Sequence, residues 1–500
     1  MKNLKKSRLK ISWTMLLLGG IILPCSPVEA DYWTTIQPSS TWGTWDGWGC
    51  SLSWWANVNA FGTNQMMAEV LFSTNDSTFT STYPVTNSIS LPDLGFNIVR
   101  YNLGAESWNA IGTNQMYVTA SLTNLPYRQI AGYWTNWYST NISSSSWTWW
   151  VDSSQRHAMW NARNLGANIF EMISYSPMWW MCYNLDPSGS GDGSSDNLES
   201  WNYDAHAVYL ASVASYAGLS WGINFNYVEA FNEPTANWWT WNCGQEGCHY
   251  NTGTQASVIG YLRTELNNRS LSGTGITASD EYSFTQASNT WQSFNSTTRS
   301  QVAKINVHGY DMNNYAAKSN LYAVAAGTRI WQSEYNDSDT SGMTLAESIN
   351  SDMTYLHPTG WCYWQPYDYS SVGLIEANLL QGVLGSPWTK YYVMAQYSRH
   401  IKQGMTIITS GDHNTTAAYD SAKNKLILVT QNWGTAQYVG YDLTQFTTAN
   451  GALTRWETDT SGSGDLYAQH NDLTWNQNKQ FWVWFPTNCI MTIEVDNVVK

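Results

Sequence analysis

Charged side chains are scarce in this 500-residue sequence, where Lys, Arg, Asp and Glu together make up only 12% of the residues. Basic residues are the scarcer kind, with 23 Lys and Arg against 37 Asp and Glu. A chain of this balance lacks the basic surface that attracts nucleic acids and anionic membranes. We therefore expect neither partner, and a neutral ligand fits the composition better.

Long apolar runs are also missing after residue 30, so we expect a soluble protein without a membrane span. The first 30 residues begin with basic side chains and continue with an apolar stretch, Ile11 to Leu23, that is too short to cross a bilayer. Val28-Glu29-Ala30 fits a cleavage site, which predicts a signal peptide over 1–30 and a secreted, extracellular protein that begins at Asp31. The remaining chain holds 18 basic and 36 acidic residues.

No pair of cysteines has the C-x-x-C spacing of a zinc site, and no histidine pair accompanies them. We therefore expect neither a metal nor another cofactor. Six cysteines lie beyond the signal segment, and an exported chain permits disulfides between them. The short loop between Cys243 and Cys248 is the favoured disulfide, with free buried thiols as the alternative.

Tryptophan and tyrosine are abundant, with 31 of each, and several tryptophans occur as doublets. Neighbouring side chains on a strand point to opposite faces, so a core does not readily bury both members of a doublet. We expect some of these rings to line an open surface, where they could stack on the apolar C–H faces of sugars. Ordinary core packing is the alternative. The rings at or after strand ends are the candidate sugar platforms: Trp54, Trp55, Trp179, Trp180, Trp238 and Trp364.

Strand-like and helix-like segments alternate over 46–400, which predicts an α/β fold, a (β/α)₈ TIM barrel. Periodicity alone leaves an open doubly wound sheet as the alternative. The expected helices include Ser154–Leu165, Asn202–Ala217, Gln255–Asn268 and Thr344–Leu356. The expected strands are Gly47–Leu52, Asn97–Asn102, Asn168–Ser174, Tyr227–Phe231, Gly275–Ala278, Lys304–Val307, Arg329–Ser333 and Gly360–Trp364.

The pattern changes after residue 400, where short alternating strands follow one another without a helix. This predicts an appended antiparallel β-sandwich over 401–500, joined by an N-terminal strand from 31–45. We find no repeat and no linker, so we expect the two parts to pack tightly as a monomer. The expected strands are Met405–Thr409, Lys425–Gln431, Ala436–Asp442, Phe481–Phe485 and Cys489–Val495.

Two glutamates, Glu233 and Glu334, follow the fourth and seventh expected strands and are surrounded by aromatic residues. Catalytic groups of TIM barrels lie at the C-terminal ends of the strands. Two carboxyl groups on one such face are what the cleavage of a glycosidic bond requires. Structural salt bridges are the alternative. Other acids near strand ends are weaker candidates: Glu229, Glu171, Asp280 and Glu281.

Several strings resemble glycoside hydrolase family 30. Asn232-Glu233-Pro234 resembles its acid/base motif, and Trp331-Gln-Ser-Glu334-Tyr resembles its nucleophile motif. Asp46-Gly-Trp-Gly49 and Asn97-Ile-Val-Arg-Tyr-Asn102 resemble its first two strands. Four further strings resemble the endo-β-1,6-galactanase branch of the family: Ser176-Pro-Met-Trp-Trp-Met181, Gln245-Glu-Gly-Cys-His249, Trp361-Cys-Tyr-Trp-Gln-Pro366 and Lys390 to Ile401. In Gly49-Cys-Ser-Leu-Ser-Trp-Trp55 the cysteine is displaced from its usual place in that branch.

The resemblance implies a retaining hydrolase that degrades the β-1,6-galactan side chains of arabinogalactan. Glu334 would be the nucleophile and must be ionised, whereas Glu233 would be the acid/base and must hold a proton when substrate binds. Asn232 is suited to the sugar 2-hydroxyl, and Arg100, His308 and Tyr310 complete the expected substrate-binding set. For these three the alternatives are an ion pair, a core histidine and plain packing.

Residue types alone leave other functions open. The alternatives are a retaining glycosidase that acts on β-1,6-glucan or xylan, and a non-catalytic carbohydrate-binding protein. The presence of both Glu233 and Glu334 argues against the second. Neither the choice between galactose and glucose nor that between endo and exo cleavage follows from the sequence.

Overall fold

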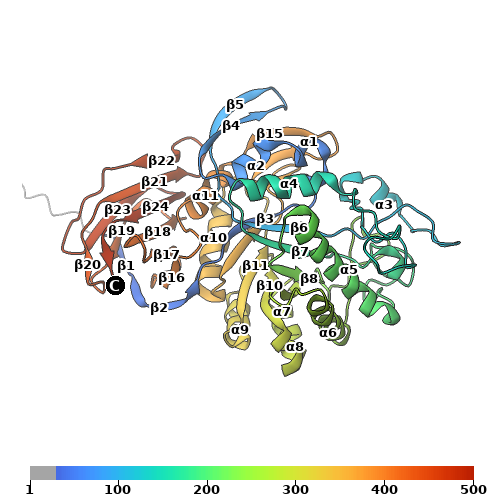
Figure 1. Ribbon diagram of the computed structural model, residues 1–500. Helices are drawn as coiled ribbons and strands as arrows, with labels where there is room; N and C mark the ends of the chain where they lie inside the picture. The colour runs from blue at the N-terminus through green and yellow to red at the C-terminus, as the bar shows by residue number, and fades with distance from the viewer. Residues whose placement is uncertain (1–29) are drawn as a thin grey trace, which may run out of the picture.

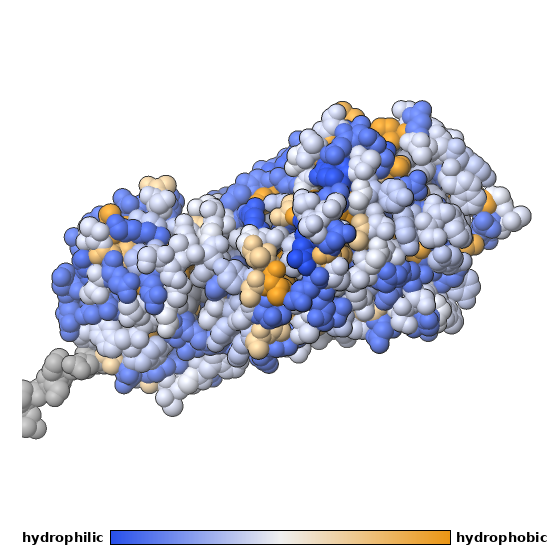
Figure 2. Space-filling model, turned by 90° about the horizontal axis from the view of Figure 1, so that it is seen from below, coloured by the Kyte–Doolittle hydropathy of each residue, from blue (hydrophilic) through white to orange (hydrophobic). Residues whose placement is uncertain are grey.

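The computed structural model describes residues 30–500 and shows a barrel surrounded by helices beside a separate group of sheets (Figure 1). The predicted signal segment therefore lies outside the described residues. Within residues 30–500, no helix is both long and apolar enough to span a membrane. The face seen in Figure 2 is largely hydrophilic, with small and separate hydrophobic patches.

Eight parallel strands close into a barrel, which confirms the predicted (β/α)₈ fold. Several of these strands are buried along their whole length, because helices cover the outside and side chains fill the inside. In barrel order the strands are β3 (Gly47–Ser51), β6 (Ile98–Asn102), β7 (Ile169–Ile173), β8 (Tyr227–Glu229), β9 (Gly275–Glu281), β10 (Val302–His308), β11 (Arg329–Glu334) and β12 (Gly360–Tyr363).

Helices on the outside of the barrel begin at side-chain caps where the sequence offers them. Asn251 accepts hydrogen bonds from two backbone N–H groups at the start of α6, and Ser283 accepts one at the start of α7. The helices are α1 (Asn59–Gly62), α2 (Gln65–Phe72), α3 (Ala120–Thr123), α4 (Ser153–Asn164), α5 (Tyr203–Tyr216), α6 (Thr252–Asn268), α7 (Phe284–Ser293), α8 (Ser296–Gln301), α9 (Tyr315–Ala325), α10 (Met343–Ser351) and α11 (Thr389–Ser398).

The remaining sheets form a second core with residues from both ends of the chain. β1 (Tyr32–Thr35) pairs with β19, and β2 (Gln37–Thr44) pairs with β16. A seven-stranded sheet follows the order β2, β16 (Thr406–Thr409), β17 (Thr415–Asp420), β18 (Lys425–Asn432), β24 (Cys489–Val495), β21 (Leu453–Asp459), β22 (Leu466–His470). A three-stranded sheet follows the order β1, β19 (Gln437–Asp442), β23 (Gln480–Phe485), and β20 (Thr448–Ala449) pairs with β25 (Val498–Val499).

Helices α10 and α11 join the barrel to the seven-stranded sheet (Figure 1). The Gln396 side chain on α11 donates to Thr458 on β21 and accepts the backbone N–H of Thr492 on β24. His400, just after α11, lies 2.8 Å from a carboxyl oxygen of Glu494. The barrel and the sheets therefore share a buried polar interface, and Ile407, Ile427 and Ile490 extend the barrel's hydrophobic core into the sheet.

Two smaller sheets are inserted in barrel loops. The hairpin β4 (Asp76–Ser81) and β5 (Asn87–Pro92) precedes β6, and β13 (Tyr367–Asp368), β14 (Ile375–Asn378) and β15 (Val383–Pro387) follow β12. In Figure 1 the hairpin and β15 lie side by side above the barrel, and backbone N–H groups of Thr82 and Tyr83 donate to the carbonyl of Leu384.

Candidate active site

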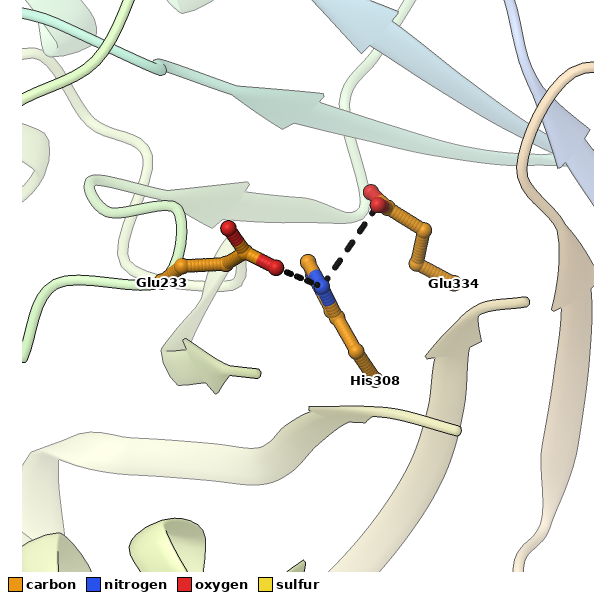
Figure 3. A group of neighbouring side chains, drawn as sticks. All are labelled: Glu233, His308 and Glu334. Carbon is orange, nitrogen blue, oxygen red and sulfur yellow. Dashed lines mark hydrogen bonds and ion pairs between the residues drawn. The ribbon is translucent and has the colours of Figure 1, made fainter. Parts of the chain in front are cut away.

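Glu233 and Glu334 meet at one end of the barrel, as expected from their places after strands. Glu233 lies four residues beyond β8, and Glu334 is the last residue of β11. Figure 3 shows both carboxyl groups directed toward His308, the last residue of β10. One oxygen of each carboxyl group and one ring nitrogen of His308 lie within 4.8 Å of one another.

The backbone of Glu233 is held in an unusual conformation, with a φ of 47° in the left-handed region. A non-glycine residue rarely adopts such a φ unless its surroundings enforce it. Here the N–H of Glu233 donates to the carbonyl of Asp280 at 2.9 Å. Its carboxyl group accepts from the indole N–H of Trp238 at 3.1 Å and lies 3.0 Å from Nδ1 of His308. Every part of Glu233 is therefore fixed.

Glu334 lies deeper, and burial raises its pKa to about 7 although His308 and Arg100 act to lower it. Tyr310 donates its hydroxyl to Oε1 of Glu334 at 2.7 Å, and Arg100 lies 3.6 Å from Oε2. Arg100 and His308 therefore favour the ionised form of Glu334 against the effect of burial. The size of the burial effect was not foreseen from the sequence.

His308 faces three carboxyl groups. Its Nε2 lies 3.1 Å from Asp280, and its Nδ1 lies 3.0 Å from Glu233 and 3.5 Å from Glu334. Burial would lower the pKa of His308, but Glu334 and Asp280 outweigh burial and raise it well above the usual range. An imidazolium with both N–H groups directed at carboxyl oxygens has no lone pair for a metal. This set of donors therefore fits a proton network better than a metal site.

A buried ionic network lies beneath the two glutamates. Arg100 on β6 pairs with Glu171 at 3.1 Å and with Asp280 at 2.7 Å, and Lys304 pairs with Glu171 at 2.7 Å. Burial would raise the pKa of Glu171, but Lys304 and Arg100 bring it below the usual value. Asp280 is likewise held ionised, because Arg100 and His308 lower its pKa despite burial. This ionic network fixes Arg100 and His308 beneath Glu233 and Glu334.

The glutamates open into a cleft of about 220 Å³. Five of the expected residues besides the two glutamates line it: Trp54, Asn232, Trp238, Tyr310 and Trp364. Sequence reasoning missed Trp239, Cys243 and Gln245, which also line it. Trp239 is the neighbour of an expected platform and donates its indole N–H to the carbonyl of Glu233 at 2.9 Å. Gln245 could have been predicted, because it begins the Gln245-Glu-Gly-Cys-His249 string that resembles the galactanase branch.

Three of the expected platforms, Trp55, Trp179 and Trp180, are buried and do not line the cleft. Trp55 packs on Tyr367 and donates its indole N–H to the carbonyl of Ser51. Trp179 donates to Ser107, and Trp180 donates to the carbonyl of Trp134. Trp179 and Trp180 lie in a short 3₁₀ turn, and Trp54 directly precedes another that begins at Trp55. Neither doublet is on a strand, so the rule of alternating faces does not apply to them.

Arg100 and His308 are fully buried and do not line the cleft, although both lie against its carboxyl groups. The weaker acid candidates are also buried. Glu171 belongs to the ionic network, and Glu281 accepts hydrogen bonds from Thr235 and Thr290. Glu229 is buried beside Asn306, and burial raises its pKa well above the usual value.

The expected disulfide is wrong, since all six cysteines of residues 30–500 are free thiols. Cys243 lines the cleft, whereas Cys248 is buried, with its sulfur 3.4 Å from the carbonyl of His249. The two side chains therefore lie in different environments despite their short separation in the chain.

One wall of the cleft rests on a buried pair of acids, Glu106 and Glu246. Glu246 directly follows Gln245 of the cleft and accepts the backbone N–H of Ala105 at 2.8 Å. Glu106 accepts no hydrogen bond from residues 30–500 at either oxygen. Burial raises the pKa of each acid well above its usual value, and for Glu106 the nearby Glu246 raises it further. The loop after β6 and the loop after β8 therefore each bury an acid whose pKa is raised.

A second group of metal-like donors, Glu457, Asp465 and His470, lies on strands β21 and β22 and the turn between them. Its members already have partners. Arg455 pairs with Glu457, and His470 lies 2.7 Å from Asp465. Ion pairing thus accounts for this group.

No known family profile matches the sequence. The chain is 50% identical over 476 residues to an endo-β-1,6-galactanase of Hypocrea rufa, an alignment that covers 94% of this chain and 96% of that protein. The structure resembles the catalytic domain of the family 30 xylanase C of Talaromyces cellulolyticus, with a TM-score of 0.66, 19% identity and coverage of 93% and 100% of the two chains. It also resembles an endo-β-1,6-glucanase, with a TM-score of 0.62, 13% identity and coverage of 93% and 95%.

The two structural likenesses concern the fold, whereas the identity to the galactanase extends over nearly the whole chain. That relationship agrees with the barrel, the added sheets and the pair of glutamates at strand ends. The chain belongs to glycoside hydrolase family 30, in its endo-β-1,6-galactanase branch.

Proposed function

We propose that the protein is a secreted, retaining hydrolase of β-1,6-galactan in which Glu334 is the nucleophile and Glu233 the acid/base. The observation that carries the mechanism is the approach of the two carboxyl groups, whose oxygens lie within 4.8 Å of each other. Retaining enzymes hold their carboxyl groups about 5–5.5 Å apart, whereas inverting enzymes need about 6.5–9.5 Å to admit a water.

The first step joins the sugar to the enzyme. A carboxylate oxygen of Glu334 bonds to the anomeric carbon while the glycosidic C–O bond breaks, and Glu233 gives its proton to the leaving oxygen. In the second step Glu233, now ionised, takes a proton from a water molecule. The oxygen of that water bonds to the anomeric carbon and displaces Glu334, which restores both carboxyl groups.

Buried neighbours supply the charges for these steps. Arg100 and the His308 imidazolium favour the ionised form of Glu334, and Tyr310 donates to it. Trp238 and His308 fix the orientation of Glu233. Asn232 lines the cleft with an amide oxygen that is free of partners within residues 30–500, and its amide is suited to the sugar 2-hydroxyl.

The substrate is proposed from the relative, which is named for endo action on β-1,6-galactan. Trp54, Trp238, Trp239 and Trp364 offer aromatic faces around the cleft to the C–H faces of galactose. An acidic chain with few basic residues suits a neutral polysaccharide. Secretion rests on the predicted signal segment.

The test is a panel of β-1,6-galactan, β-1,6-glucan and xylan, with chromatographic sizing of the products and NMR of the newly formed anomer. We expect galactan to be cleaved fastest, into oligosaccharides of several lengths, with the β-anomer formed first. Faster cleavage of glucan or xylan would show that galactan is not the preferred substrate. An α-anomer formed first would show that the enzyme inverts the anomeric carbon and does not retain its configuration. Binding without any cleavage would leave a carbohydrate-binding protein.

A further inference from the structure

A second hollow lies outside the catalytic cleft, between the β4–β5 hairpin and the loop after β12. Its volume is about 580 Å³, more than twice that of the cleft and within the usual range of small-molecule sites. Cleft and hollow have no lining residue in common. Trp364 lines the cleft and Tyr369 lines the hollow, so the loop after β12 contributes side chains to both.

Three aromatic side chains surround this hollow: Tyr83, Tyr369 and Trp388. Tyr83 is 54% exposed and Tyr369 is 68% exposed, so neither ring is used to fill the core. Large side chains left open to water around a concave surface commonly mark a binding site.

Hydrogen bonds join the two segments that carry these rings and fix the Trp388 indole. The N–H of Tyr83 donates to the carbonyl of Leu384 on β15 at 2.9 Å, and Leu384 donates in turn to the hydroxyl of Thr82. The indole N–H of Trp388 donates to the carbonyl of Ser370, next to Tyr369, at 3.2 Å. The hollow is therefore pre-formed from two inserted segments that lie far apart in sequence.

The polar lining is neutral apart from one carboxyl group. Asn378, Gln381, Ser370 and Ser371 offer amide and hydroxyl groups, and Glu376 is the charged residue among the residues that line the hollow. Lys and Arg are missing from that lining, so an anionic ligand would meet only repulsion from Glu376. Aromatic faces beside hydroxyl, amide and carboxyl groups suit a neutral ligand rich in hydroxyl groups.

Gly385 on β15 lies in close contact with the Glu376 side chain. A Cβ atom added to Gly385 would come within 2.6 Å of the Glu376 carboxyl oxygen and within 2.8 and 2.9 Å of its Cβ and Cγ atoms, so the whole side chain would have to move. The glycine in β15 therefore gives the Glu376 side chain its place in the hollow.

From these contacts we propose that the hollow is a second carbohydrate-binding site, which holds a neutral sugar of the polysaccharide while another part of that chain occupies the catalytic cleft. Tyr369, Tyr83 and Trp388 would stack on pyranose C–H faces, and Glu376 would accept sugar hydroxyl groups. That this sugar belongs to β-1,6-galactan rests on the proposed function.

The experiment uses the full chain with Tyr369→Ala, Trp388→Ala and Gly385→Ala, and Tyr261→Ala as the matched control. Tyr261 is an exposed tyrosine on the outer helix α6, 47% exposed and away from both sites. Gly385→Ala keeps all three aromatic residues and displaces the Glu376 side chain. Each variant is first shown by thermal melting to be as stable as the parent protein.

Two measurements decide the proposal. The first is electrophoresis through gels that contain β-1,6-galactan, β-1,6-glucan or xylan, which identifies the glycan that retards the parent protein. On that glycan we expect Tyr369→Ala, Trp388→Ala and Gly385→Ala to bind at least several-fold more weakly than Tyr261→Ala. In kinetics, we expect KM on that polysaccharide to rise several-fold while kcat/KM on a short oligosaccharide stays unchanged. Unchanged retardation of Tyr369→Ala and Trp388→Ala would overturn the second site.

The two proposals fail separately. A parent protein that hydrolyses no galactan, yet loses retardation on another neutral glycan through Tyr369→Ala, would refute the proposed substrate and support the hollow. A parent that hydrolyses galactan and whose site variants keep full affinity and KM would support the proposed function and refute the hollow.

Discussion

The chemistry of single residues centres on the His308 imidazole, which lies against Glu233, Glu334 and Asp280. Its Nε2 lies 3.1 Å from Asp280, and its Nδ1 lies between the carboxyl groups of Glu233 and Glu334. A change of charge on either glutamate is therefore felt by the other through a fixed cation. This arrangement suits a reaction in which the two carboxyl groups exchange charge.

Glu334→Gln should lower kcat by at least about a thousandfold, because the covalent step loses its nucleophile. The amide keeps the size of the side chain, so galactan binding should remain close to that of the parent. Turnover and affinity electrophoresis measure the two effects. Glu69→Gln on α2, remote from the cleft, is the matched control, and activity of Glu334→Gln within tenfold of it would show that another group is the nucleophile.

The pH profile of kcat/KM should have an acid limb governed by Glu334, whose pKa is raised to about 7. Below that pKa the carboxyl group is protonated and cannot attack, so activity falls with falling pH. His308→Gln removes a neighbouring cation that lowers the pKa of Glu334 and should move the limb to higher pH by about one unit or more. A limb that stays in place would mean that His308 does not act through Glu334.

The sequence predicted the paired glutamates because both follow strands of one barrel, and a barrel brings all such positions to one face. It did not predict which tryptophans line the cleft. Trp54 and Trp55 are neighbours, yet a 3₁₀ turn directs one into the cleft and the other against Tyr367. Nor did it predict that burial outweighs Arg100 and His308 at Glu334, since that balance depends on depth.

Among the elements, the eight barrel strands were predictable because each is a short apolar run followed by polar residues. In the C-terminal part β17, β21 and β22 were missed. β21 and β22 carry mixed apolar and polar residues along much of their length and lie at the far edge of the sheet from β2. The long loops after β6 and β8 were also unpredictable, because their shape depends on contacts such as the Glu106–Glu246 pair.

That pair predicts how these two loops respond to alkali. The folded pKa of Glu106 lies well above its unfolded value of about 4.3, so its contribution to stability is complete at acidic pH and is lost as pH rises through the folded pKa. Glu106→Gln cannot ionise, so its melting temperature should exceed that of the parent at alkaline pH, by about 2–4 °C per kcal/mol recovered. Melting curves across pH measure this, with Glu69→Gln as control.

A melting temperature of Glu106→Gln that falls with pH as steeply as that of the parent would show that ionisation of Glu106 does not cause the loss of stability. Activity gives a second check, because Gln245 of the cleft lies next to Glu246. Ionisation of the two buried acids in alkali should lower the activity of the parent before the whole protein unfolds.

At the scale of the whole molecule, the barrel and the added sheets share one interface through α10 and α11. Asn350 on α10 accepts from Thr416 at 2.7 Å, and Gln396 on α11 bonds to two strands of the sheet. These groups are buried and would lose their partners without the sheets. The sheets therefore support the barrel, and they hold no acid that reaches the cleft.

Truncation after Gly404 should give insoluble or thermally weakened protein, because it exposes apolar surface and leaves buried polar groups unpaired. The separate fragment 401–500 should not fold, since β1 and β2 supply the edges of both sheets. Solubility, thermal melting and circular dichroism of the two fragments test this. A stable truncated barrel, beside a folded fragment that is retarded on galactan gels, would instead indicate an independent sugar-binding module.

The pairing of β1 with β19 also bears on the order in which the molecule is assembled. Tyr32 is opposite Val439, so a strand made at the start of synthesis waits for a partner made near its end. Most barrel strands pair with the barrel strand that is next in sequence, and the closure of the barrel between β3 and β12 is the long-range exception. The opening segment must meanwhile keep an unpaired edge, and such contacts between distant parts of a chain form slowly. Completion of these sheets brings together segments from far apart in the chain, and we therefore expect it to be a late event of folding.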